Sequence, residues 1–316
     1  MHRALVLSGG GARGSWQVGA CDHLIGEKGV WFDIISGVSV GAINGTTLAH
    51  ARDLDSLRAH LERLRSVWFG VRGDDNVYRR RRFGALGLAL GKWGGLYDTT
   101  PLRDEILGRE IDPAQVAASP IRLKVGYLDL RSGRFRTAEN DHPRLREAVL
   151  ASCSMPVFFP PVRLPESREL GVDGGVRNFA PLAGALHALA ELPPERDPSE
   201  VWVMHLRRLR KVTAAKMVRN YLRSVFPSLS IRTDEALVDE ARSPRATNSF
   251  LVSGVIRGRQ RDLRLRVLHP ARDLPGSVLD FDPAKIRAWY EDGLRTARRL
   301  HETDPVPIAG HGHSTD

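Results

Sequence analysis

The stretch that decides the fold is residues 3–41, RALVLSGGGARGSWQVGACDHLIGEKGVWFDIISGVSVG. Short apolar runs alternate in it with glycine-rich turns and a longer segment of helical spacing, which is typical of the start of an α/β sheet. The expected elements are a strand over Arg3–Leu7, a turn over Ser8–Gly14, a helix over Trp16–Ile25, a strand over Phe32–Ser36 and a helix from Val40. We therefore predict an α/β fold with a mostly parallel central sheet flanked by helices.

The same alternation continues downstream. Leucines after Asp53 recur every three or four residues as far as Trp68, which predicts a helix with one buried face. Further expected elements are strands over Ile121–Leu128 and Val201–His205 and helices over His142–Leu150, Pro181–Leu192 and Pro283–His301. Because no internal repeat or clear linker interrupts the chain, we predict a single domain over residues 1–302, with a disordered tail over residues 303–316.

Two basic segments depart from this pattern. Residues 70–95 are expected to form a loop or an inserted lid, in which the basic run Arg79–Arg82 precedes the apolar segment Phe83–Leu90. Two interpretations stay open for it: a surface excursion with solvated arginines, or a lid or membrane-docking patch. Arg207–Arg223 is expected to form a basic amphipathic helix, for which a solvated face and a membrane or anion contact are equally compatible.

Composition narrows the classes of partner and compartment. The chain of 316 residues has a formal net charge of +10 and a pI near 10.2, which fits an anionic partner such as nucleic acid, a membrane surface or an acidic substrate. Its two cysteines, Cys21 and Cys153, are too few for a disulfide framework and fit a reducing compartment. No apolar run approaches the roughly 18 residues of a membrane-spanning helix. We predict a cytoplasmic protein, and peripheral contact with an anionic membrane through the basic segments stays open.

The pentapeptide Gly37-Val38-Ser39-Val40-Gly41 lies between an expected strand and an expected helix, the context in which a G-x-S-x-G motif is informative. Gly37 and Gly41 allow a tight turn that projects the Ser39 hydroxyl beside the positive end of the helix. Alone, this motif is only moderately specific, because serines also occur in ordinary strand-to-helix turns.

A second glycine-rich loop, Gly9–Gly14, ends the preceding strand with the sequence GGGARG. In a parallel sheet this loop is expected next to Ser39. Bare glycine amides can approach a developing oxyanion closely, and Arg13 can add charge or hold a phosphate. The candidate oxyanion donors are the amides of Gly9, Gly10 and Gly11.

The same loop matches the G-x-G-x-x-G fingerprint of dinucleotide-binding proteins. That fingerprint requires an acid at the end of the second strand, whereas this strand ends in Gly37-Val38-Ser39 and the nearest acid, Asp33, precedes it. A P-loop is excluded because Ser15 and Trp16 follow Gly14 where a lysine and a hydroxyl residue belong. A module that binds a nucleotide or lipid phosphate without hydrolysis stays an alternative.

Asp173 lies between small residues in Gly171-Val172-Asp173-Gly174-Gly175. This pattern suits a buried carboxylate, and burial raises the pKa of an aspartate from its ordinary value of about 3.9, which makes it a better base. By itself Asp-Gly-Gly more often marks a turn. The rival arrangement is an α/β-hydrolase triad in which His205 or His269 serves Ser39, although that fold normally has several strands before its nucleophile.

Taken together, these blocks resemble the patatin-like phospholipase family. Its signature is a G-G-G-x-R/K-G loop, a G-x-S-x-G turn and a D-G-G/A motif far downstream, and all three occur here in order. The similarity extends over about the first two thirds of the chain. The motif glycines are Gly14, Gly37, Gly41, Gly174 and Gly175, and further similar blocks are Ala151–Val162, Asn178–Leu182 and Leu96–Leu102.

The resemblance implies a three-layer α/β/α fold and a Ser-Asp dyad without histidine. Asp173 would take the proton from Ser39, which attacks a fatty acyl ester and forms an acyl-enzyme that water then hydrolyses. The implied activity is that of a phospholipase A, lysophospholipase or lipid acyl esterase, with no metal, no cofactor and no nucleic-acid partner. Substitution of His187, His205 or His269 is expected to leave substantial turnover.

Overall fold

The computed structural model describes residues 1–91, 94–164, 167–193, 199–208, 251–256 and 263–303. The expected basic helix from Arg207 to Arg223 lies outside these residues apart from Arg207 and Arg208. The expected tail also lies outside them from residue 304 onward.

The described chain is built around one large sheet. Its strands are β1 Arg3–Leu7, β2 Ile34–Val38, β5 Arg122–Asp129, β6 Arg134–Ala138, β7 Val162–Leu164, β8 Glu169–Asp173, β9 Ser199–Met204, β10 Leu251–Ile256 and β11 Leu263–Leu268. Their order is β10-β11-β9-β1-β2-β5-β8-β7, and β6 pairs with β5. Strands β11, β9, β1, β2 and β5 are parallel, and the antiparallel pairs lie on either side of them. This confirms the predicted mostly parallel central sheet.

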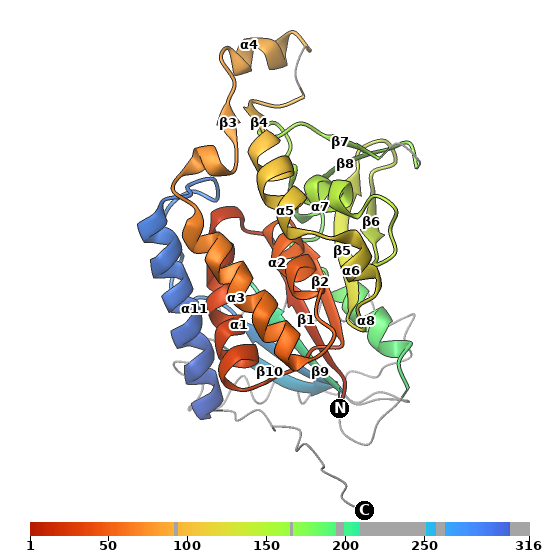
Figure 1. Ribbon diagram of the computed structural model, residues 1–316, viewed down its shortest axis with the longest axis vertical. Coiled ribbons are helices and arrows are strands. Elements are labelled where there is room, and N and C mark those ends of the chain that lie inside the picture. The colour runs from red at the N-terminus through yellow and green to blue at the C-terminus, as the bar shows by residue number, and fades with distance from the viewer. Residues whose placement is uncertain (92–93, 165–166, 194–198, 209–250, 257–262, 304–316) are drawn as a thin grey trace, which may run out of the picture.

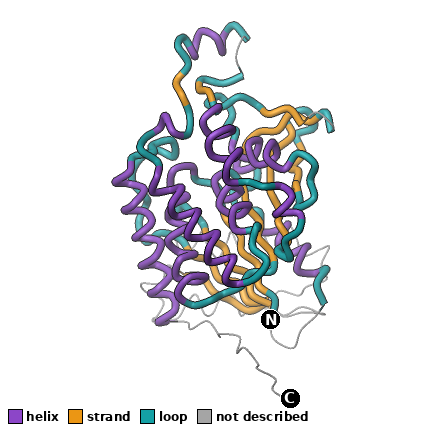
Figure 2. The backbone as a smooth tube through the Cα atoms, viewed as in Figure 1, coloured by secondary structure: helices purple, strands orange, loops and turns teal. Residues whose placement is uncertain are grey.

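Helices cover both faces of the sheet (Figures 1 and 2). On β1, Leu5 and Leu7 belong to the core shared with α1, α2, α3, α7 and α11, whereas Ala4 and Val6 belong to the core shared with α8. Because successive side chains of a strand point to opposite faces, this division gives the predicted three layers. The longer helices are α1 Ser15–Cys21, α2 Val40–Leu48, α3 Leu54–Gly70, α7 Leu145–Cys153, α8 Leu182–Ala190 and α11 Pro283–Thr303.

The first and last helices of the described chain pack closely together. A Cβ atom on Gly19 of α1 would lie 1.9 Å from the carbonyl oxygen of Tyr290, and one on Gly293 of α11 would lie 1.9 Å from that of Trp16. Both positions therefore require glycine, and α11 is fixed over the start of the chain. The helix that begins at Ser15 continues as a π-helical segment over Asp22–Glu27.

The expected regular alternation of strands and helices is wrong between β5 and α8. The chain there forms the antiparallel strands β6, β7 and β8, with α7 between β6 and β7. These strands are short, and most of β6 is partly or fully exposed, so they carry no continuous apolar run of the kind that marks a buried parallel strand.

Residues after α3 form a segment that projects from the end of the molecule (Figure 1). The two short strands β3 Arg79–Arg80 and β4 Tyr97–Asp98 pair antiparallel, and the short helix α4 Gly84–Ala89 lies between them. The strand β3 and the helix α4 lie within the expected insertion at residues 70–95, but the segment extends beyond it to β4. The domain limits at residues 1 and 302, and a lid function for the segment, stay predictions. Between β4 and β5 lie a π-helical segment Pro101–Leu107, α5 Gly108–Glu110 and α6 Pro113–Ala117.

Candidate active site

Ser39 lies at the sharp turn between β2 and α2. Its backbone has φ 55° and ψ −130°, a conformation that residues other than glycine rarely adopt. A Cβ atom on Gly37 would lie 2.2 Å from the carbonyl oxygen of Gly41, and one on Gly41 would lie 2.3 Å from that of Leu7. The two flanking glycines therefore permit the turn, and Ser39 faces a cavity at the carboxyl ends of the central strands.

The glycine-rich loop after β1 lies beside this turn, as the sequence predicts. A Cβ atom on Gly9 would lie 3.2 Å from that of Ser39. The amide of Gly9 donates a hydrogen bond of 3.0 Å to the carbonyl oxygen of Phe179. In the described part of the chain, the amides of Gly10 and Gly11 have no such partner, so these two are the available donors of the loop.

Arg13 and its neighbour Ala12 bind this loop to residues 276–278 by hydrogen bonds. Its Nη2 donates to the carbonyl oxygen of Gly276 at 2.7 Å, and the neighbouring amide of Ala12 donates to that of Val278 at 2.8 Å. Burial and the positive charge of Arg207 lower the pKa of Arg13. Arg13 is absent from the described wall of the cavity, so the structure shows it supporting the loop from outside.

Asp173 ends β8 and faces the same cavity. Ser39 and Asp173 are each 8% exposed. Burial raises the pKa of Asp173 to about 6, against the opposing effects of the nearby Ser39 hydroxyl and of a hydrogen bond from the Gly175 amide. The Gly175 amide lies 2.7 Å from Asp173 Oδ1, and a Cβ atom on Gly174 would lie 2.7 Å from the carbonyl oxygen of Gly126. The small flanking residues therefore let the carboxylate approach Ser39.

A buried polar network lies beneath the glycine-rich loop. Asn44 on α2 donates to the carbonyl oxygen of Gly14 at 3.1 Å and to Gln17 Oε1 at 3.0 Å. Trp68 Nε1 donates to Asn44 Oδ1 at 3.0 Å, and Gln17 Nε2 donates to the carbonyl oxygen of Ser8 at 2.9 Å. The network joins α1, α2 and α3 to both ends of the loop. Sequence analysis assigned no role to Asn44 and Gln17, although polar residues inside two predicted helices are a signal that could have indicated this network.

Ser152 on α7 holds the backbone of the Ser39 turn. The Ser39 amide donates to Ser152 Oγ at 2.8 Å, and Ser152 Oγ donates to the carbonyl oxygen of Gly126 at 2.6 Å. Ser152 is fully buried. It lies in the block Ala151–Val162 that carries part of the family resemblance, but sequence reasoning assigned it no role.

The cavity has a volume of about 260 Å³, and its wall is mainly apolar. Its polar side chains are Ser39, Asp173 and Arg207, whose Cζ lies 4.3 Å from the centre of the Phe179 ring. Arg207 follows the carboxyl end of β9, beside β1, where parallel sheets commonly bind ligands. The apolar wall includes Leu64, Val67, Trp68, Leu102, Phe159 and Phe281.

No histidine is among the described residues that line this cavity. His205 Nδ1 lies 2.9 Å from the carbonyl oxygen of Arg207, and burial lowers the pKa of His205 to about 4. Burial also lowers the pKa of His269, whose Nδ1 lies 2.9 Å from the carbonyl oxygen of Pro270. His187 is exposed on α8, the helix on the opposite face of the sheet. The structure thus brings Ser39 together with Asp173.

Among the described residues, no three or more His, Cys, Asp or Glu side chains are grouped so that they could hold a metal ion. The described helices include none that has both the length and the apolar character to cross a membrane.

Several known proteins match a large part of the chain. The cGAMP-activated phospholipase of Escherichia coli (strain TW11681) is 26% identical over 230 residues, which are 65% of this chain and 61% of that protein. The cGAMP-activated phospholipase of Vibrio cholerae (serotype O1) is 26% identical over 234 residues, which are 66% of this chain and 64% of that protein. The chain therefore spans less than two thirds of the length of these relatives.

The chain is also similar to solved structures and matches a protein family. The crystal structure of VipD from Legionella pneumophila superimposes with a TM-score of 0.48 at 16% identity, covering 96% of this chain and 67% of that one. The family described as patatin-like phospholipase matches residues 5–186, which is more than half of the chain. These residues include the Gly9–Gly14 loop, the Ser39 turn and Asp173. The chain belongs to the patatin-like phospholipase family.

Proposed function

We propose that this chain is a serine acyl-hydrolase that cleaves fatty acyl esters, with Ser39 as nucleophile and Asp173 as general base. The observation that carries the proposal is that Ser39 and the buried carboxyl group of Asp173 face the same mainly apolar cavity, with burial raising the pKa of Asp173 to about 6. A base with a pKa near neutrality is deprotonated at physiological pH and still accepts a proton readily. Membership of the family supports this assignment.

In the first half of the reaction, Ser39 Oγ attacks the acyl carbonyl carbon while Asp173 takes the hydroxyl proton. The tetrahedral intermediate collapses when the bond to the alcohol oxygen breaks, and Asp173 returns its proton to that leaving oxygen. The products are a free alcohol, such as a lysolipid, and an acyl-enzyme on Ser39.

In the second half, Asp173 takes a proton from water as the water oxygen attacks the acyl-enzyme carbonyl. The bond to Ser39 Oγ then breaks, Ser39 regains the proton from Asp173, and a fatty acid leaves. One carboxylate therefore serves both steps, because it returns to its ionised form after each of them.

The amides of Gly10 and Gly11 are the proposed donors to the oxyanion, since that of Gly9 already binds Phe179. The Val40 amide, in the first turn of α2 where helix N–H groups lack an intrahelical partner, is a third candidate donor. Such preorganised donors typically give the largest electrostatic contribution to acyl transfer. Arg13 assists by holding this loop in place through Gly276.

The proposed substrate is a phospholipid, lysophospholipid or other lipid acyl ester. The mainly apolar wall suits a fatty acyl chain, because apolar surface gains free energy when it leaves water. Arg207 at the wall of the cavity suits an anionic group beside the scissile ester. No metal ion, cofactor or nucleic acid enters the proposed reaction.

Fatty-acid release from a phospholipid and from a soluble p-nitrophenyl ester tests the proposal. We expect Ser39→Ala and Asp173→Asn to lower kcat by at least about a thousandfold, because each removes a group that acts in both steps. His187→Ala, His205→Ala and His269→Ala are the matched variants and should retain substantial turnover. Full activity in Ser39→Ala or Asp173→Asn would overturn the mechanism, and a comparable loss in a correctly folded histidine variant would favour a triad.

A further inference from the structure

The large apolar side chains that remain exposed in the described chain are not scattered over its surface. Scattered exposed apolar residues are ordinary, whereas their accumulation in one region marks a binding surface. Six such side chains are between 46% and 67% exposed: Phe83, Leu86, Leu90, Leu130, Val157 and Val176.

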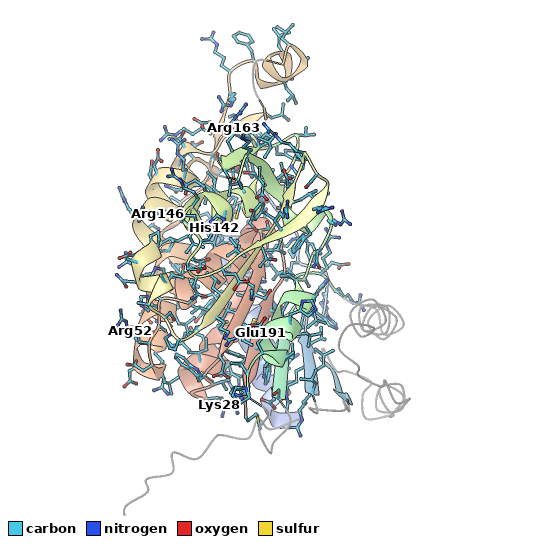
Figure 3. The ribbon with its side chains drawn as sticks, turned by 90° about the vertical axis from the view of Figure 1, so that its right-hand side faces the viewer. Lys28, Arg52, His142, Arg146, Arg163 and Glu191 are labelled. Atoms are coloured by element: carbon cyan, nitrogen blue, oxygen red, sulfur yellow. The ribbon has the colours of Figure 1, made fainter. Side chains whose placement is uncertain are left out.

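All six lie at the end of the molecule where the parallel strands finish. Phe83, Leu86 and Leu90 belong to the projecting segment around α4, which stands clear of the body in both Figure 1 and Figure 3. The carbonyl oxygen of Val157 accepts a hydrogen bond of 2.9 Å from the amide of Leu96, at the base of this segment. Val176 lines the cavity three residues beyond Asp173. Leu130 directly follows the carboxyl end of β5.

Exposed arginines accompany these apolar side chains. Arg82 places its Cζ 5.4 Å from the centre of the Phe83 ring, and Arg80 is exposed on β3. Neither Arg80 nor Arg82 has an acidic partner in the part of the chain that the structure describes. Arg163, labelled in Figure 3, lies at the same end of the molecule, and the exposed Arg177 directly follows Val176.

The projecting segment does not close the cavity. No described residue from Tyr78 to Pro101 lines the cavity wall. Leu86 on α4 and the flanking residues Phe83 and Leu90 are instead exposed to solvent, and α4 lies at the far tip of the projecting segment (Figure 1). A lid would bury these side chains against the site, so the arrangement points to a surface outside the chain.

We propose that this end of the molecule is a docking face for a bilayer that contains anionic phospholipids. The docking face consists of Phe83, Leu86, Leu90, Val176 and the arginines Arg80, Arg82 and Arg163. The apolar tip enters the boundary between headgroups and acyl chains, and the arginines remain among the anionic headgroups. The arginines make the docking face positively charged, and the whole chain has a formal net charge of +10. Both charges complement an anionic surface.

Docking in this orientation sets the mouth of the cavity against the lipid, because Val176 belongs to both the face and the cavity wall. The docking face extends the proposed function, because it implies that the enzyme meets its lipid substrate in a bilayer. In this respect the inference rests on the proposed function. Binding to a bilayer needs no hydrolysis, however, so the two claims can be tested separately.

Vesicle sedimentation with the full chain in a Ser39→Ala background tests the docking face. The vesicles contain phosphatidylcholine alone or with about one third phosphatidylglycerol. We expect strong preference for the anionic vesicles. We expect Phe83→Ser/Leu86→Ser/Leu90→Ser to lower the partition coefficient by about a thousandfold, since burial of each of the three large side chains is worth roughly tenfold. Arg80→Glu/Arg82→Glu should lower it by at least about tenfold and reduce its salt dependence.

Lys28→Glu/Arg52→Glu is the matched charge control, because Figure 3 shows both residues at the opposite end of the molecule. Its partition coefficient should fall much less than that of Arg80→Glu/Arg82→Glu. If the two double variants lose vesicle binding equally, the effect comes from net charge alone and the proposed docking face is wrong. Wild-type binding by the triple serine variant would also overturn it. So would an oligomer of wild type that the triple variant converts to a monomer, since the face would then join two copies of the chain.

Hydrolysis of a soluble short-chain ester, measured with Ser39 intact, separates failure of this inference from failure of the proposed function. The α4 variants should hydrolyse the soluble ester at the wild-type rate and lose activity on anionic vesicles. Retained soluble activity with unchanged vesicle binding and hydrolysis rejects only the docking face. Loss of vesicle binding in these variants, in a chain whose wild type has no esterase activity, rejects only the proposed function.

Discussion

At the level of single residues, the site depends on two residues that are held in unfavourable states: the backbone of Ser39 is strained, and the carboxyl group of Asp173 is buried. Ser39 occupies a backbone conformation that typically costs on the order of 1–3 kcal/mol. Burial raises the pKa of Asp173 from 3.8 to about 6, which corresponds to about 3 kcal/mol against its ionised form. The sequence predicted both features through the small residues around them. It did not predict that Phe179 binds the Gly9 amide, because that contact joins residues far apart in the chain.

The raised pKa of Asp173 predicts the pH dependence of turnover. In the proposed mechanism Asp173 must be ionised to act as the base, so kcat/KM for a soluble ester should rise with pH, reach half its maximum near pH 6 and stay level above about pH 7. A pH–rate profile of the wild type and of His205→Ala checks this. The account fails here if the profile is flat down to about pH 5, or if its midpoint disappears in His205→Ala.

The same shift has a consequence for stability. Because the pKa of Asp173 is higher in the folded chain than in the unfolded one, its neutral form stabilises the fold. This contribution is fully present below pH 3.8 and is lost as pH rises through about 6. If Asp173 is the base, as proposed, the site should become active over the pH range in which Asp173 stops stabilising the fold, the usual trade-off between stability and activity.

At the level of elements, the sequence predicted what local periodicity determines. The helix with leucines at Leu57, Leu61 and Leu64 is amphipathic, and β1 is a buried apolar run, so both were recognisable from neighbouring residues. The strands β6, β7 and β8 were missed because they are short and partly exposed. The contribution of residues 278–281 to the cavity was also missed, since contacts between distant parts of the chain, namely α11 with α1 and Val278 with Ala12, bring them there.

The contact between α7 and the Ser39 turn yields a prediction about positioning. Ser152→Ala removes the acceptor of the Ser39 amide and the donor to Gly126, so we expect the turn to relax. The kcat for a soluble ester should fall by about ten- to a hundredfold with little change in KM, because a misplaced nucleophile slows chemistry more than it weakens binding. Steady-state kinetics and thermal unfolding measure the two effects.

Ser154→Ala is the matched control for that variant. Ser154 is also buried, but its Oγ donates to the carbonyl oxygen of Leu150 within α7 and does not touch the turn. In each variant the free energy of unfolding should fall by no more than about 3 kcal/mol. If Ser154→Ala loses as much kcat as Ser152→Ala, or if Ser152→Ala keeps the wild-type kcat, Ser152 has only a structural role.

At the level of the whole molecule, the carboxyl ends of the parallel strands gather the chemistry at one end. The Gly9–Gly14 loop follows β1, Ser39 follows β2, and Arg207 lies just beyond β9, so three strands that are adjacent in the sheet converge on one cavity. Asp173 arrives from β8, which pairs antiparallel with β5. The exposed apolar tip around α4 lies at this same end (Figure 1). The parallel sheet thus places the cavity and the proposed docking face together.

The central claim is that Ser39 and Asp173 alone form the nucleophile and its base. Reaction with an alkyl fluorophosphonate, followed by peptide mass spectrometry, tests it most directly, because Ser39 Oγ displaces fluoride from phosphorus as Asp173 takes the hydroxyl proton. The account predicts one adduct, on Ser39, that is absent in Ser39→Ala, forms at least about a hundredfold more slowly in Asp173→Asn and forms at the wild-type rate in His205→Ala. An adduct on another residue, or labelling of Asp173→Asn at the wild-type rate, would contradict it.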